Sequence, residues 1–253
     1  AISHWPLAKA VSAFGQLGVV SGIGIDLILC SRLAEGDPEG HVRRALSHFP
    51  FPDLAEQVVS EYFRASGSHE DEVSKLPTLW TATPTIDRVQ LGVLAGFMEV
   101  FLAKEGHENR VGINLLEKAQ LANLSVLYGA MLAGVDVVIV GAGVPMKYPG
   151  IIDQLVRHED VSYPLDVCGA SAGQEAHIEL RPDEVFPGIA NRAGDLRRPM
   201  FLPIVSSNAL ASALVKRANG TIDGFIVEYP IAGGHNAPPR GRGSVSATGE
   251  PVY

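Results

Sequence analysis

The chain contains only two cysteines, Cys30 and Cys168, which lie far apart and form no C-x-x-C pair. Neither a disulfide framework nor a thiolate zinc site is therefore expected. The eight histidines form no H-E-x-x-H or comparable group, so no metal is predicted. This cysteine usage suits a reducing compartment, and we expect a cytoplasmic protein.

The sequence also lacks an excess of positive charge. Its net charge is −8 and its pI is about 5.5, which argues against nucleic acid or an anionic membrane surface as a partner. The most apolar stretch, 126–144, is interrupted by Gly134 and Asp136. We therefore expect a helix, a turn and a strand there, and no membrane span.

Familiar catalytic motifs are missing as well. There is no G-x-S-x-G elbow and no Walker A loop, and GAGVP at 141–145 is only a weak candidate for a phosphate-approaching turn. The sequence therefore does not indicate a hydrolase, a P-loop NTPase or a complete dinucleotide fingerprint.

What the sequence does contain is an alternation of apolar strands and amphipathic helices. This pattern predicts a parallel sheet covered on both faces, either a barrel or an open doubly wound sheet, with its chemistry beyond the carboxyl ends of the strands. A chain of 253 residues suits a single α/β barrel domain. The six expected strands are 17–22, 110–116, 135–143, 162–169, 200–207 and 220–230.

The segment 24–77 interrupts this alternation. Asp37 can cap one helix that has Pro38 at its first position, and Asp53 can cap another that runs through Phe63. We expect a helical insertion within the barrel domain.

The run 232–243, rich in glycine and proline, follows the last apolar strand directly. Gly233 and Gly234 allow a backbone to approach a flat ligand closely, and their N–H groups can bond its heteroatoms. His235 can act there as a base near neutral pH. The spacing fits equally a flexible exit loop whose histidine faces solvent.

Two polar residues stand within apolar strands. Asn114 lies in GINLL, where its amide costs free energy unless it is hydrogen-bonded, either to a ligand or to a neighbouring loop. Glu228 ends the strand FIVE, where a carboxylate can accept a hydrogen bond from a ligand or form an ion pair at the rim.

At GINLL, VIVGAG and above all GFIVEYPIAGGHNAPPRG, the sequence resembles the nitronate monooxygenase family, formerly 2-nitropropane dioxygenases, with its enoyl-thioester reductase relatives. The resemblance implies an FMN-binding (β/α)₈ TIM barrel as a single domain over 1–253, with 24–77 as an insertion characteristic of a longer subfamily. It also implies further strands before Ala1 and after Tyr253, so the barrel is expected to be incomplete in this chain.

Matched residue by residue, the resemblance makes Asn114 an FMN contact, Gly233 a backbone flavin contact and His235 the catalytic base or substrate-orienting group. Glu228 stands where many members have a glutamine beside the flavin. A glutamine side chain both donates and accepts hydrogen bonds, whereas an ionised glutamate can only accept them. The glutamate therefore changes the expected flavin contact.

The function that the resemblance implies is FMN-dependent oxidation of a small carbon acid, such as an alkyl nitronate, by O₂. One alternative is an enoyl-thioester reductase that uses NAD(P)H, and another is a non-catalytic barrel-derived binding module. A small-molecule substrate is expected in the two enzyme cases. The sequence leaves the oligomeric state open, a homo-oligomer included.

Overall fold

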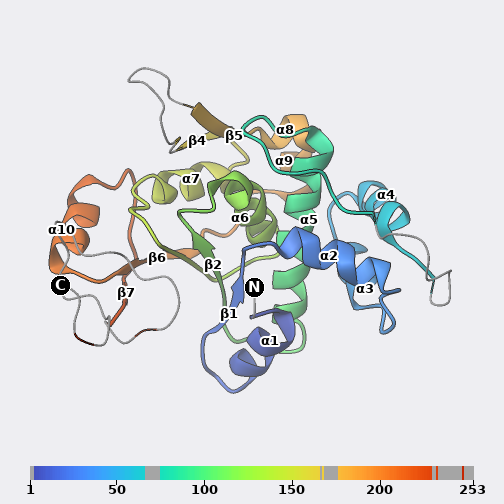
Figure 1. Cartoon of the computed structure of the whole chain (residues 1–253), viewed down its shortest axis with the longest axis horizontal. Coiled ribbons are helices and arrows are strands. Elements are labelled where there is room, and N and C mark those ends of the chain that lie inside the picture. Colours follow the sequence, from blue (N-terminus) through green and yellow to red (C-terminus); the bar gives the residue numbers. More distant parts are fainter. Residues whose placement is uncertain are drawn as a thin grey trace.

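The computed structural model describes residues 3–65, 75–165, 167, 176–229, 232 and 247. Its centre is a curled sheet of five parallel strands in the order β1-β2-β3-β6-β7 (Figure 1). The strands of this sheet are β1 (Gly18–Ser21), β2 (Val111–Leu116), β3 (Val137–Gly141), β6 (Met200–Val205) and β7 (Ile226–Val227).

The expected eight-stranded TIM barrel is wrong for this structure. Over the described residues the sheet is a half-barrel of five strands, whereas a closed barrel of this type needs eight. The parallel direction and the βα alternation were predicted correctly, because they follow from local apolar runs and short connections.

The strand expected at 162–169 is also not part of the main sheet. β4 (Val161–Leu165) instead pairs antiparallel with β5 (Ala176–Leu180), and β3 pairs directly with β6. In β5 the side chains of His177 and Glu179 are exposed while Ile178 is buried. This alternation is typical of an antiparallel ribbon with one solvated face, not of a strand covered on both faces.

Helix α5 is the central helix of the molecule, and most of its residues are buried. It crosses α6 at very close range, because a Cβ at Gly96 would lie 2.3 Å from the carbonyl oxygen of Val126. The helices are α1 (Trp5–Ala13), α2 (Ile25–Ala34), α3 (His41–Leu46), α4 (Pro52–Tyr62), α5 (Ile86–Lys104), α6 (Asn123–Leu132), α7 (Tyr148–Leu155), α8 (Pro182–Val185), α9 (Ile189–Ala193) and α10 (Asn208–Arg217), with a 3-10 turn η1 (Gln120–Ala122).

Segment 24–77 contains α2, α3 and α4, which lie across α5 from the sheet in Figure 1. Asp37 does accept hydrogen bonds from the first turn of α3, including one of 3.1 Å from the N–H of Val42. The helix nevertheless begins later than predicted, at His41, because Gly40 precedes it in the left-handed conformation. None of the helices over the described residues is long and apolar enough to cross a membrane.

Asp136 ties the amino-terminal side of the sheet together. Its carboxylate accepts from Lys104 Nζ at 2.5 Å, from the Val111 N–H at 2.9 Å and from the Arg197 guanidinium. Burial raises the pKa of Asp136, but the hydrogen bonds and positive charges of these partners outweigh it, and the pKa lies below the ordinary value of 3.8.

We expect Asp136→Asn to lower the free energy of unfolding at pH 7 by about 1.5–3 kcal/mol, the usual cost of losing hydrogen bonds to a charged group. A lowered folded-state pKa contributes stability above the unfolded value, and this contribution is lost as the pH falls through the folded value. The difference between variant and wild type should therefore shrink below about pH 4.

Urea unfolding followed by circular dichroism at pH 7, 5 and 3 measures this effect. Glu159→Gln is the control, because Glu159 pairs with Arg157 on an exposed surface, and its stability should match that of the wild type. A pH-independent difference at Asp136 would contradict the assignment.

Candidate functional site

The carboxyl ends of the five parallel strands meet at one edge of the half-barrel. Ligand sites of parallel α/β sheets lie beyond this edge, in the loops that follow the strands. We therefore ask which of the predicted site residues lie at this edge of the sheet.

Asn114 faces the concave side of the sheet. Its neighbours Ile113 and Leu115 belong to the helix-covered core, and successive side chains of a strand point to opposite faces. Its Oδ1 is buried and has no hydrogen-bond partner among the described residues. An unsatisfied buried acceptor costs about 1–3 kcal/mol, so a ligand that donates a hydrogen bond there would remove this cost.

The concave surface beside Asn114 is apolar. Asn114 is in register with Ile139 on β3, and Ile139 with Leu202 on β6. Two residues further along β3, the lack of a side chain at Gly141 leaves room for Ile204 of the neighbouring strand β6. A Cβ at Gly141 would lie 2.6 Å from Ile204 Cδ1. Ser21 on β1 is the other register partner of Asn114. Two polar residues beside an apolar stretch suit a flat ligand that has a hydrogen-bonding edge.

Glu228 follows β7 at the same edge. It is half-buried, and its backbone N–H donates to the carbonyl of Val205 at 2.8 Å. β3 and β6 separate β2 from β7, so Asn114 and Glu228 are three strand spacings apart. The register also places Glu228 four residues further along the strand direction, so the two residues are roughly 20 Å apart on a flat sheet. A small ligand cannot contact both, and only an extended cofactor could.

A cavity of about 420 Å³ lies between the carboxyl ends of β6 and β7, next in the chain to Glu228. Ser206, Ser207 and Phe225 contribute to its lining. Val205 and Val227 alternate with Ile204 and Ile226 along their strands, so this cavity opens on the face of the sheet opposite to the Asn114 side chain.

The other predicted site residues, Gly233, Gly234 and His235, lie outside the described residues. Ala232, directly before them, donates its N–H to the carbonyl of Tyr229 at 2.8 Å. The roles of the two glycines and the histidine stay predictions from the sequence.

A polar cluster that the sequence did not predict lies beyond β2 and β3. The Tyr163 hydroxyl donates to Glu117 Oε1, and Asn123 Nδ2 donates to the Tyr148 hydroxyl at 2.9 Å. Burial and the negative charge of Glu117 raise the pKa of Tyr148 above its ordinary range. Glu117 could have been noticed as the first residue after the strand, but its tyrosine partner comes from a distant hairpin.

The turn at 141–145 is filled by this cluster. A Cβ at Gly143 would lie 2.1 Å from Glu117 Cγ, so this glycine makes room for the Glu117 side chain. Ala142 has φ of 59°, a left-handed conformation that costs a residue with a Cβ about 1–2 kcal/mol. A carboxylate in this position disfavours a phosphate at the turn, because like charges repel.

Among the described residues, no group of three or more histidine, cysteine, aspartate or glutamate side chains could hold a metal ion. No protein-family model matches the chain, and no curated protein sequence matches it significantly. Proposals about its function therefore depend on its own residues and on the resemblance of its motifs.

Proposed function

We propose that the protein is an FMN-dependent oxidoreductase of the nitronate monooxygenase type, which oxidises a small carbon acid such as an alkyl nitronate with O₂. The observation that supports this most directly is Asn114 Oδ1, a buried acceptor without a partner in the described part of the chain. It lies within β2, beside the apolar concave face of the sheet. A flavin ring fits this arrangement because it combines flat apolar faces with an N–H on its edge.

In this proposal Asn114 would accept a hydrogen bond from the flavin ring, and Glu228 would contact another part of the cofactor. Gly233 and Gly234 offer backbone N–H groups, and their small size permits close approach. FMN supplies the acceptor for the substrate's electrons. His235 takes the proton from the carbon acid or orients its anion.

We expect Asn114→Leu to have opposite effects on stability and on FMN binding. Leucine has a similar branched shape and removes the buried acceptor, so the flavin-free variant should be more stable by up to about 1–3 kcal/mol. FMN affinity should fall by roughly tenfold or more, because a hydrogen bond to the ring is lost. Thermal unfolding and flavin fluorescence quenching measure the two quantities.

Asn123→Leu is a matched control. Asn123 Oδ1 is likewise buried without a partner among the described residues, but its Nδ2 donates to Leu116 and Tyr148. This variant should therefore lose stability with those two hydrogen bonds and keep its FMN affinity. If Asn114→Leu instead destabilises the flavin-free protein and binds FMN normally, Asn114 has a structural role and the proposal loses its support.

Anaerobic reduction of the bound flavin identifies the reaction. An alkyl nitronate should bleach the flavin absorbance quickly, whereas NAD(P)H should not. Fast bleaching by NAD(P)H alone would indicate an enoyl-thioester reductase. A protein that stays colourless after reconstitution with FMN would be a binding module, and the proposed activity would be wrong.

A further inference from the structure

A second cavity, of about 340 Å³, lies beyond the carboxyl ends of β1 and β2. We call it the Trp80 cavity. Its lining comes from the loop 22–24, the loop 118–122 and the extended segment 77–80, and it is largely apolar. Leu27 and Leu79 are 50% and 88% exposed at its rim. Large apolar side chains exposed beside a cavity indicate a ligand with an apolar part.

The charged group of this cavity is Arg88, on the first turn of α5. Its guanidinium pairs with Asp26, and both side chains are only 4% exposed. The Trp80 ring covers the guanidinium, with Arg88 Cζ 4.1 Å from the ring centroid. Trp80 Nε1 donates a hydrogen bond to Asp26 Oδ2 at 2.9 Å. Trp80 packs directly on α5, because a Cβ at Gly92 would lie 2.9 Å from the indole.

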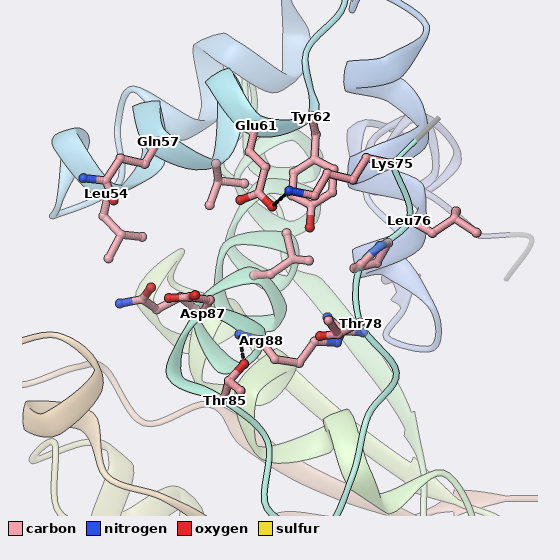
Figure 2. Close-up of a pocket in the computed structure, with 14 residues that line it drawn as sticks. Leu54, Gln57, Glu61, Tyr62, Lys75, Leu76, Thr78, Thr85, Asp87 and Arg88 are labelled. Carbon is pink, nitrogen blue, oxygen red and sulfur yellow. Dashed lines mark hydrogen bonds and ion pairs between the residues drawn. The ribbon is translucent and has the colours of Figure 1, made fainter. Parts of the chain in front are cut away.

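The donors of Arg88 are not all used. Nε and Nη1 are buried and have no acceptor among the described residues. Figure 2 shows the Arg88 side chain running from α5 toward Thr78. Arg88 lines both the Trp80 cavity and a neighbouring cavity of about 320 Å³. A buried guanidinium with spare donors is costly unless an acceptor is supplied, and an anion in the cavity would supply one.

Two further features favour an anion of single charge. α2 begins at this cavity after Gly24, and its first turn has no side-chain cap from that residue, so its N–H groups add positive potential. Lys118 is exposed at the cavity. Because Asp26 offsets one of the two cations, the site retains about one net positive charge.

From these contacts we propose that the Trp80 cavity binds a monocarboxylate with an apolar chain. Arg88 anchors the carboxylate, while Leu27, Leu79 and Leu121 contact the chain. The single net charge favours a carboxylate over a phosphate dianion, and the apolar lining favours an acyl or aryl acid over a small polar one. The lining of this cavity contains none of the proposed flavin contacts, and the proposal does not depend on them.

Tryptophan fluorescence can report binding directly, since the chain has two tryptophans, Trp5 and Trp80. In a Trp5→Phe background the signal comes from Trp80 alone. Octanoate should change this signal saturably, and octanol should bind about tenfold or more weakly because it lacks the charge. Octyl phosphate tests the phosphate alternative.

Two variants in this background test the role of Arg88. Asp26→Asn keeps an acceptor for Trp80 Nε1 but removes the competing charge, so octanoate affinity should rise by roughly threefold or more. Asp26→Asn combined with Arg88→Met removes the ion pair as a whole and avoids an unpaired buried charge. This double variant should bind octanoate about tenfold or more weakly than wild type.

Lys75→Met is the matched control. Lys75 is a cation of the neighbouring cavity and pairs with Glu61 at 2.6 Å, so octanoate affinity should not change. Leu79→Ser alters only an exposed side chain and should weaken octanoate binding even if the double variant fails to fold.

Three outcomes would overturn the proposal. Octanol could bind as tightly as octanoate, octyl phosphate could bind more tightly than octanoate, or a folded double variant could keep wild-type affinity. A fluorescence signal that does not saturate up to roughly 10 mM octanoate would also reject the proposal, because most specific sites have dissociation constants below this concentration. None of these outcomes bears on FMN binding, so the two proposals fail independently.

Discussion

Glu99→Ala is expected to lower the free energy of unfolding by about 3–5 kcal/mol, the cost of breaking a buried ion pair by removing one partner. Glu99 lies within α5, and its side chain is 0% exposed. Oε1 accepts from Arg32 Nη1 at 2.6 Å, and Oε2 accepts from the Trp5 N–H at 2.7 Å. The substitution leaves a partly buried cation and a backbone N–H without their acceptor.

Denaturant unfolding measures this loss, with Glu105→Ala as the matched control. Glu105 caps the carboxyl end of α5 and pairs with Arg44 and Lys9, but it is 33% exposed. Solvent-exposed pairs contribute about 0–1 kcal/mol, so the control should lose far less. If the two variants lose the same free energy of unfolding, burial does not strengthen the contribution of the Glu99 ion pair to stability.

Combining Arg32→Leu with Glu99→Leu tests the same argument from the opposite side. Replacing both partners of a buried pair by apolar residues is often nearly neutral. The double variant should therefore recover much of the stability lost in Glu99→Ala. The remaining deficit would measure the hydrogen bond from the Trp5 N–H.

In the FMN-loaded protein, His235→Asn is expected to lower turnover of an alkyl nitronate by about 10²–10⁴-fold, the usual contribution of a general base. FMN affinity should stay within about twofold of wild type, because the imidazole acts on substrate in this proposal and backbone groups of the loop contact the flavin. Oxygen consumption gives the turnover, and fluorescence titration gives the FMN affinity.

His177→Asn provides the comparison. His177 is exposed on β5, away from the main sheet, so turnover should be unchanged. If His235→Asn keeps wild-type turnover, His235 is not the base. If it loses FMN together with activity, its role is in cofactor binding.

Local patterns in the sequence were sufficient to predict the strands of the main sheet. They also explain α5, where the Thr85 side chain accepts the Arg88 N–H at the start of the helix. Helix periodicity and capping depend on residues only a few positions apart, so a linear sequence contains them. The polar Asn114 was recognisable for the same reason, because it interrupts an apolar strand.

The pairing of strands was not predictable in the same way. The run at 162–169 has the composition of a sheet strand, yet β4 pairs with β5 and leaves β3 beside β6. A strand's own residues specify that it needs a partner, but long-range contacts select which partner it has. The resemblance implied an eight-stranded barrel, incomplete in this chain, but the composition of a strand does not determine how many strands its sheet contains.

The sequence by itself determined the βα alternation, the parallel direction of the main strands and the position of Asn114 at an apolar strand, because each depends on neighbouring residues. Tertiary structure alone decided the half-barrel and the Asp26–Arg88–Trp80 cluster, and it left Asn114 Oδ1 without a partner in the described part of the chain. Asp26 and Arg88 are 62 positions apart in the chain. Whether a buried polar atom finds a partner depends on the packing of such distant segments, and no local pattern encodes it.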